Sequence, residues 1–353
     1  MAVDWTASME QTYKYYEVDP ITWKNKEEIR NIRDCSIDWD VDTDTLCSAS
    51  ISIENLTKEC YIRAYLVTIQ NGVTEEHPLG TFLVQTPSQS FNGKSQTIKL
   101  DAYSPLTELK EKYPVLGYTI MAGSNIMDYT SALTAENMRP PVVPATNAKT
   151  NFLDFTADPD DTWLSFLISY MSNAKYQYDL DPIGRVLFKP RQEVAALQPV
   201  WTFDDGNSSI LYPDISMDRD LYGIPNVVEV SYSSEGNSYY AKVVNDDENS
   251  PISTVNRGRE VVHRVTNPEL SGVPTQSQIQ EYAEQLLADM SSLEYKLTYK
   301  HGYCPVRIGD CVMLDYARAG LRNIKAKVTT QSISCTTGCP VTETAVFTTK
   351  LWG

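Results

Sequence analysis

A regular order of helix, strand and tight turn in the last third of the chain constrains the fold most. Thr275 and Gln278, directly after Pro274, form a capping box, in which two side chains close the first turn of a helix. The helix that follows has apolar residues three or four positions apart, which predicts one buried face (Ile279, Tyr282, Ala283, Leu286, Leu287 and Met290). Alternating apolar and polar residues over 293–299 then predict a strand. We expect the helix face to hold this part of the chain together.

The first hundred residues predict strands joined by tight turns. Cys60–Gln70 is a run rich in Tyr, Ile, Val and Thr, and it ends in Asn71-Gly72, a strong signal for a β-hairpin. Ile37–Asp42 alternates apolar and acidic residues, so we expect its carboxylates on the exposed face of a strand (Asp38, Asp40 and Asp42). Further strands are predicted near the other end of the chain (Cys311–Tyr316, Lys325–Ser334 and Val341–Leu351). Two β-rich regions are therefore expected.

The middle of the chain, from about residue 104 to 200, predicts a mixed α+β domain. Ser104-Pro105 is typical of the start of a short helix that runs to Lys112. Asp158-Pro159 predicts the start of a second helix, because a capping Asp precedes Pro at the first helical position. Tyr176–Lys189 predicts a hairpin around a Pro-Ile-Gly turn. The fold class expected for the whole chain is β-rich α+β.

Charge and cysteine usage exclude several classes of protein. A formal charge of −16 argues against binding nucleic acid through its phosphates, which requires clustered Lys and Arg. No secretory signal and no apolar run of the roughly 18–20 residues that a membrane span needs can be identified. We therefore expect a protein made in a cytoplasm, without integral membrane association, whose seven cysteines are free thiols.

No set of residues passes the pattern test for a catalytic, cofactor or metal site. Asp38, Asp40, Asp42 and Asp44 resemble the start of a calcium loop, but Gly and Glu are absent from the positions that an EF-hand requires. The three histidines lie in unrelated segments, and neither a G-x-S-x-G elbow nor a phosphate-binding loop occurs. Four cysteines leave open a loose metal site, although ordinary thiols are favoured (Cys304, Cys311, Cys335 and Cys339). The protein is expected not to be an enzyme.

Arg257-Gly258-Arg259 is the one notable basic cluster of this acidic chain. In an interface, Arg257 and Arg259 could each bind a partner's carboxylate through two hydrogen bonds. The alternative is a solvated loop, and the residues alone leave both interpretations open.

The order of elements in the last third resembles the central tail-hub proteins of bacteriophages. A strand, the loop segments Asn249–Thr254 and Arg257–Glu260, a helix, a strand and the turn Pro305–Val312 follow one another. The family includes the baseplate hub of T-even phages, the hub of phage Mu and the N-terminal hub module of siphophage tail-tip proteins. The hairpin pattern of the N-terminal part is consistent with the same family (Tyr61–Gln70, Leu79–Phe82 and Ala102–Ser104).

This resemblance implies two β-barrels similar to tail-tube subunits, with smaller α/β domains inserted. The expected domains are an N-terminal barrel (1–103), an α+β insert (104–200), a second barrel (201–232 plus 300–353) and an inserted strand-helix subdomain (233–299). Three copies would then supply six barrels to a ring that matches a hexameric tube.

The resemblance also implies a structural role in the tail tip or baseplate of a virion made in a bacterial host. The homotrimer would join the tail tube or distal tail protein to a central spike or tip protein and let DNA pass during ejection and host entry. Asp38, Asp40 and Asp42 are candidates for the wall of the lumen, where acid would repel phosphate. Many hub relatives carry a similar Gly-Arg loop, which favours the interface interpretation of Arg257 and Arg259. The alternative function is a carbohydrate-binding receptor-recognition protein (adhesin) of the same tail tip.

Overall fold

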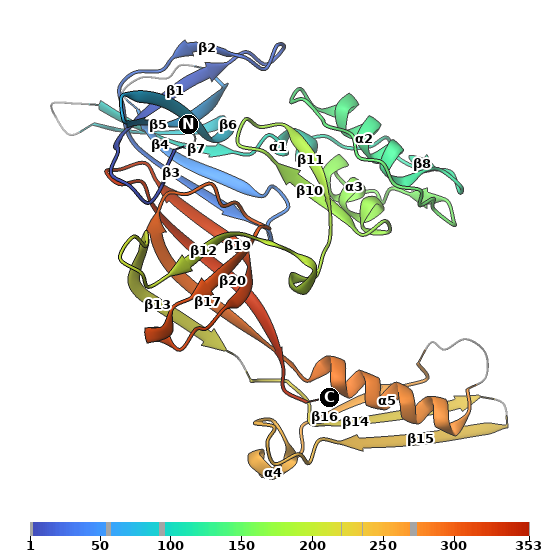
Figure 1. Cartoon of the computed structure of the whole chain (residues 1–353). Helices are drawn as coiled ribbons and strands as arrows, with labels where there is room; N and C mark the ends of the chain where they lie inside the picture. Colours follow the sequence, from blue (N-terminus) through green and yellow to red (C-terminus); the bar gives the residue numbers. More distant parts are fainter. Residues whose placement is uncertain are drawn as a thin grey trace. The chain divides into compact units, whose positions relative to one another are not determined.

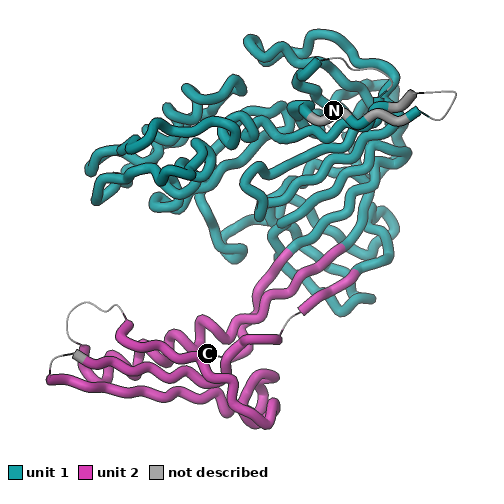
Figure 2. Tube along the Cα trace, turned by 180° about the vertical axis from the view of Figure 1, so that it is seen from behind, with its two compact units in different colours: residues 1–215, 299–345 teal, residues 216–298, 346–353 magenta. Residues whose placement is uncertain are grey.

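The computed structural model describes residues 3–53, 58–91, 96–219, 221–234, 236–268 and 274–352. Strands dominate and a few short helices cover them, which confirms the β-rich α+β class (Figure 1). The chain divides into two compact units, which Figure 2 distinguishes by colour: Met1–Ile215 with Tyr299–Ala345, and Ser216–Thr298 with Val346–Gly353. Among the described residues, no helix is both long and apolar enough to span a bilayer.

The first β region contains seven strands: β1 (Glu10–Val18), β2 (Asn25–Glu28), β3 (Ile32–Asp40), β4 (Cys47–Ile53), β5 (Cys60–Gln70), β6 (Val73–Phe91) and β7 (Gln96–Tyr103). The predicted hairpin at Asn71-Gly72 is confirmed, because β5 and β6 pair from Gln70↔Val73 onward. Asn71 and Gly72 both have positive φ, 53° and 77°, which a two-residue hairpin turn of this kind requires.

The predicted strand over Ile37–Asp42 is two residues too long. β3 ends at Asp40, because the Asp40 carboxylate accepts a hydrogen bond from the backbone N–H of Asp42 at 2.9 Å and starts a turn. Within the strand the alternation holds: Ile37 and Trp39 are buried and Asp38 is exposed. Asp42 is also exposed, but it lies in the turn and not on the face of the strand.

The insert follows β7 and contains α1 (Thr107–Lys110), β8 (Thr119–Ile120), α2 (Ile126–Asn137), β9 (Phe155–Thr156), α3 (Trp163–Ser172), β10 (Tyr176–Leu180), β11 (Val186–Pro190) and the 3-10 turn η1 (Val194–Ala196). An aromatic core holds it together. Phe166 of α3 is fully buried, and its ring lies 5.2 Å from that of Phe155 and 5.9 Å from that of Tyr118. The predicted hairpin is confirmed, with Leu180 paired to Val186.

Two features of the insert differ from expectation. α3 begins at Trp163 and not at Asp158-Pro159, because Thr162 and Ser165 form the capping box while Asp161 closes a separate turn on Asp158. The helix α2 was not predicted. Its start is fixed by Asn125, whose side chain accepts hydrogen bonds from the next turn.

The second β region contains β12 (Pro199–Asp204), β13 (Leu211–Arg219), β17 (Ser292–Gly302), β18 (Cys311–Asp315), the 3-10 turn η2 (Ala317–Ala319), β19 (Ile324–Ser334) and β20 (Pro340–Lys350). Through antiparallel pairing of β19 with β3, from Thr330↔Asp40 to Ser334↔Ser36, both β regions belong to one sheet. Its main path runs β13-β17-β20-β19-β3-β4-β7-β6-β5-β1-β2. For the described residues this path is open, so closure of two separate barrels is not seen.

The second unit contains a three-stranded sheet and a helix on one of its faces: β14 (Val227–Ser234), β15 (Asn237–Val244), α4 (Thr254–Arg257), β16 (Val262–Thr266) and α5 (Gln276–Met290). The capping box of Thr275 and Gln278 is confirmed. The buried face of α5 is centred on Ile279, Ala283 and Leu287, which pack against β14 and β15. Tyr282 and Leu286 are only partly buried, so they lie at the edge of the buried face and not at its centre.

Leu287→Ala is expected to lower the free energy of unfolding of the second unit by about 2–4 kcal/mol, because a fully buried leucine leaves a cavity. Leu286→Ala is the matched control, since the same atoms are lost from a partly buried site, and about 1 kcal/mol or less is expected. Urea unfolding followed by circular dichroism measures both. Equal effects of the two substitutions would contradict the assigned packing.

Candidate functional site

Two buried side chains of β5 hold the insert against the first β region. Tyr61 and Arg63 are two positions apart, so both project from the same face of the strand. They are 1% and 4% exposed. For a chain whose predicted role is structural, we take the place where its parts join as the candidate site. We call this place the joint: it consists of the contacts of β5, of the turn 181–185 between β10 and β11, and of the loop 303–310.

Arg63 makes four hydrogen bonds, all to uncharged acceptors. Its Nε donates to Thr81 Oγ1 at 2.9 Å and one terminal nitrogen donates to Asn25 Oδ1 at 2.9 Å. The other terminal nitrogen donates to the carbonyl oxygens of Ile183 at 2.8 Å and Trp23 at 3.3 Å. A buried guanidinium thus links β5 and β6 to the turn 181–185 of the insert. A buried charge is tolerated only when hydrogen bonds of this kind replace its hydration.

The turn 181–185 packs closely on the same strands. The indole Nε1 of Trp23 donates to Ile183 O at 2.8 Å, beside the Arg63 bond. Gly184 has a φ of +80°, and a Cβ atom there would lie 2.8 Å from Thr81 Cβ and 3.0 Å from Trp23 Cζ2. Only glycine therefore fits both the backbone and the space at this position.

Gly184→Ala is expected to lower the free energy of unfolding by about 2–4 kcal/mol, since strain at positive φ adds to a clash with packed side chains. Gly72→Ala is the matched control: its φ is +77° and open space surrounds it, so strain alone should cost about 1 kcal/mol. Thermal unfolding of both variants is the measurement. If both shift the midpoint equally, the close approach at Gly184 is wrong.

Tyr61 makes the second contact with the insert through Glu108 of α1. Its hydroxyl donates to Glu108 Oε1 at 2.5 Å, and Arg139 Nε donates to the same oxygen at 2.7 Å. The Arg139 guanidinium also lies over the Tyr61 ring, 5.3 Å from its centre. Burial, and next the negative charge of Glu108, raise the pKa of Tyr61, so its hydroxyl remains a donor at any physiological pH.

The expected turn over Pro305–Val312 is built around Gly309 and Asp310. Gly309 has a φ of +81°, and the Asp310 carboxylate accepts a hydrogen bond from Arg307 N at 2.9 Å and closes the turn. The Arg307 guanidinium donates to Leu180 O and lies 3.3 Å from Asp179 Oδ1, both in β10. The pattern therefore fixes a turn whose arginine attaches the second β region to the insert.

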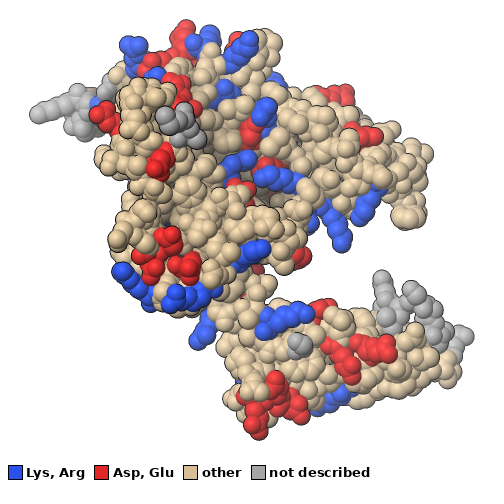
Figure 3. All heavy atoms as spheres, viewed as in Figure 1, with Lys and Arg blue, Asp and Glu red and all other residues tan. Residues whose placement is uncertain are grey.

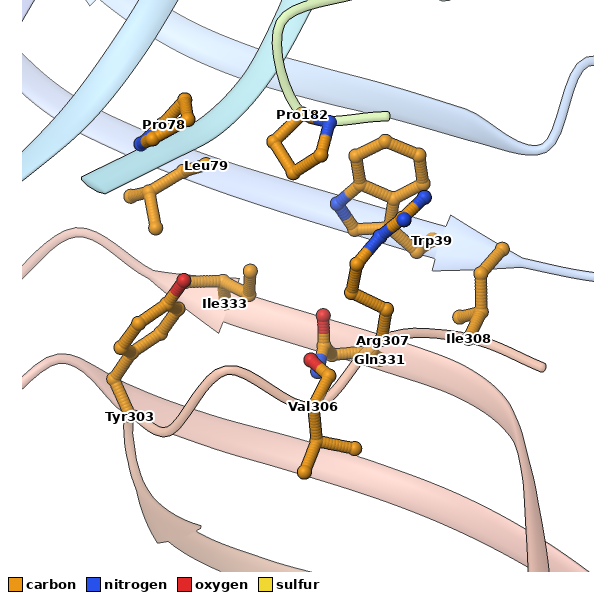
Figure 4. A pocket seen from close by; sticks show the side chains of 10 residues that line it. All are labelled: Trp39, Pro78, Leu79, Pro182, Tyr303, Val306, Arg307, Ile308, Gln331 and Ile333. Atoms are coloured by element: carbon orange, nitrogen blue, oxygen red, sulfur yellow. The ribbon is translucent and has the colours of Figure 1, made fainter. Parts of the chain in front are cut away.

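A cavity of about 20 Å³ lies where these parts meet (Figure 4). Its walls come from β3, β6, β19, the turn 181–185 and the loop 303–310 (Trp39, Pro78, Leu79, Pro182, Tyr303, Val306, Arg307, Ile308, Gln331 and Ile333). That volume holds about one water molecule. This cavity is therefore too small for a metabolite.

One buried polar cluster was not predicted from the sequence. The Tyr299 hydroxyl donates to Glu343 Oε2 at 2.8 Å, and Gln331 Nε2 donates to Glu343 Oε1 at 2.7 Å. His301 Nε2 lies 3.4 Å from Glu343 Oε1, and both side chains are fully buried. A substrate cannot reach such a pair, so its effect is on the packing of the second β region.

The basic cluster has two different environments. Arg257, the last residue of α4, donates from its guanidinium to Ile224 O at 2.7 Å and Leu221 O at 2.9 Å. Gly258 takes the left-handed conformation after the helix, with a φ of 63°, and Arg259 is exposed. Arg257 therefore secures a neighbouring loop, whereas the side chain of Arg259 reaches the surface.

The candidate cysteines do not form one site. Cys304 Sγ lies 3.9 Å from His301 Nδ1, whereas Cys335 and Cys339 flank the turn between β19 and β20. Cys311 is buried at the start of β18. In the part of the chain that the structure describes, no three His, Cys, Asp or Glu side chains are arranged to hold a metal ion.

No protein-family model and no curated protein matches the sequence. The structure, however, is similar to solved phage and prophage tail proteins. The tail protein from Neisseria meningitidis MC58 has 14% identity and a TM-score of 0.63, covering 95% of this chain and 97% of its own. The 43 kDa tail protein of prophage MuSo2 from Shewanella oneidensis has 10% identity and a TM-score of 0.61, with 95% and 98% covered. The prophage tail protein gp18 from Listeria monocytogenes EGD-e has 11% identity and a TM-score of 0.50, with 94% of each chain covered.

These comparisons concern the fold. They extend over nearly the whole length of this chain and of each similar protein. The resemblance to phage tail proteins that the order of elements predicted is thereby confirmed at the level of the structure. At such low identity the roles of individual residues do not carry over.

Proposed function

We propose that this chain is the structural hub of the tail tip of a phage or phage-like particle. Three copies form a ring that joins the tail tube or distal tail protein to the central spike or tip protein and lets DNA pass. The observation that carries the proposal is the similarity of fold to phage tail proteins over almost the full length of both chains. The protein would be made in the bacterial host and located in the virion.

The joint supports a mechanical role. A hub must keep its parts in register while a tube is built on it, and buried, fully hydrogen-bonded contacts resist bending. Arg63 and Glu108 make two such contacts, and the half-buried Arg307 adds a third hydrogen-bonded contact, all within one unit. We propose the four domains 1–103, 104–200, 201–232 plus 300–353, and 233–299, with one tube-like β region in the first and one in the third; the residues of β14 belong with the fourth, because this strand pairs with β15 and β16. Three copies would then present six such regions.

We further propose that the protein has no catalytic activity and binds no cofactor. On the face drawn in Figure 3, Lys and Arg among the described residues are interspersed with Asp and Glu and form no basic stripe. That arrangement suits DNA in transit, because a basic stripe would hold phosphate by releasing counterions. Of the basic cluster, we propose Arg259 as the partner contact, with Arg257 supporting its loop.

Deletion of the gene in the producing phage or prophage tests the proposal against the adhesin alternative. Without a hub, tail tubes should not be nucleated, so electron microscopy should show particles without complete tails. Supplying the chain in trans should restore the tails. Complete tails that fail only to adsorb to the host would instead favour the adhesin and overturn the proposal.

We also propose that Asp38, Asp40 and Asp42 line the lumen. Substituting lysine at Asp38 and Asp42 should leave the monomer folded, because both are exposed; Asp40 is kept, since its carboxylate caps the turn. The basic wall should slow DNA ejection, most strongly at low salt. Ejection is measured by dye release from purified particles. Unchanged ejection kinetics at low salt would place the carboxylates of Asp38 and Asp42 outside the lumen.

A further inference from the structure

Two cysteines face each other where the two β regions are joined. Cys35 of β3 and Cys335, directly after β19, are neighbours in register, since the ladder between these strands ends at the pair Ser334↔Ser36. The backbone N–H of Cys335 donates to Cys35 O at 2.9 Å. Residues opposed in such an antiparallel pair have Cα atoms about 5.5 Å apart. A disulfide spans Cα distances of about 4.4–6.8 Å, so the backbone separation is suitable.

The surroundings of the two thiols agree with this pairing. The Cys35 side chain, and next burial, raise the pKa of Cys335. Burial, and next the two cysteines, raise the pKa of Tyr15 on β1. Cys35 is buried and Cys335 is half-buried beside an exposed turn, so a small reagent reaches Cys335 first.

We propose that Cys35 and Cys335 form a disulfide when the protein leaves a reducing cytoplasm and meets a small disulfide oxidant. The Cys335 thiolate attacks one sulfur of the oxidant, forming a mixed disulfide and releasing one thiolate. The Cys35 thiolate then attacks the Cys335 sulfur and expels the second thiolate. Each cysteine loses one proton, and the two electrons reduce the oxidant to two thiols.

The bond would cross-link the two β regions at the strand pair that unites them, β3 and β19. Such a link closes a loop that spans most of the chain, and long loops give the largest loss of unfolded-state entropy. Because thiolates are the reactive species and the pKa of Cys335 is raised, closure should be slow at neutral pH and faster as pH rises. The chain would thus stay reduced inside the cell and become fixed outside it. This inference does not depend on the proposed function.

Cys339 is the competing partner, since it lies across the same turn from Cys335. It is buried, and burial raises the pKa of its thiol. Cys35, however, lies opposite Cys335 in the strand register and accepts its backbone hydrogen bond at 2.9 Å, whereas the backbone N–H of Cys339 donates to Thr336 O within the turn. The geometry therefore favours Cys35.

The test treats the purified, fully reduced chain with glutathione disulfide at mildly alkaline pH under native conditions. Intact mass should fall by two hydrogen atoms, and the thiol count in denaturant should fall by two from seven. Peptide mapping without reduction should then yield one linked pair that contains Cys35 and Cys335. This readout needs no variant, so a variant that fails to fold does not affect it.

Substitutions provide the matched comparison. Cys35→Ala and Cys335→Ala should each abolish the mass loss, whereas Cys339→Ala should keep it. A persistent mass gain of one glutathione on wild type, no reaction while the urea-unfolded chain oxidises, or a linked Cys335–Cys339 peptide would each overturn the proposal.

Discussion

Arg63→Met is expected to lower the free energy of unfolding by about 3–5 kcal/mol, because it removes every donor from a buried, hydrogen-bonded side chain. Methionine keeps most of the apolar stem but no donor. Four acceptors then lose a hydrogen bond, among them the backbone oxygens of Trp23 and Ile183 in a site that water hardly reaches, although Ile183 O keeps the bond from Trp23 Nε1. Urea unfolding of the full chain measures the change, and limited proteolysis should show faster cleavage in the turn 181–185.

Two further variants separate the geometry of the site from its charge. Arg63→Lys keeps the charge but cannot reach all four acceptors, so an intermediate loss is expected. Lys58→Met removes an exposed cation paired with Glu17 at 3.0 Å, and should cost less than about 1 kcal/mol. A loss for Arg63→Met as small as that for Lys58→Met would show that Arg63 does not hold the insert.

The double variant Arg63→Met, Glu108→Leu is expected to lose about 4–6 kcal/mol, the largest total effect. Glu108→Leu alone should lose about 2–4 kcal/mol, because the buried Tyr61 hydroxyl loses its acceptor while the half-exposed Arg139 remains solvated. Both contacts fasten the insert to β5, so after one is broken the other has less to hold. The double loss should therefore be smaller than the sum of the single losses.

The double-mutant cycle that tests this compares unfolding free energies of the wild type, both single variants and the double variant. A coupling energy above about 0.5 kcal/mol is expected, since the residues belong to one network. Strictly additive losses would mean that the two contacts act independently and that the insert is not held as one body.

Where one local rule decides, the sequence was a sufficient guide. The capping box at Thr275, the hairpin at Asn71-Gly72 and the strands near Cys311 and Ser334 are set by neighbouring residues, and the structure contains all of them. The pattern around Gly309 and Asp310 was recognisable for the same reason: a left-handed glycine and a turn-closing carboxylate act over a few positions.

Long-range contacts could not be predicted in this way. Arg63 lies in a strand otherwise rich in apolar residues, and nothing in that run indicates that residues 23, 81 and 183 surround it. The start of α3 was misplaced because Thr162 competes with Asp158 as a cap, and α2 was missed because its one strong signal is Asn125. The opposition of Cys35 and Cys335 arises from pairing between the two ends of the chain.

The most direct test of the central claim is the number of copies of this chain in the assembled tail tip, determined by electron cryomicroscopy of intact particles. The proposed hub predicts three copies around a central passage, with the two β regions of each chain contributing to one ring of six. Six copies, or a single copy at an exposed tip, would contradict it.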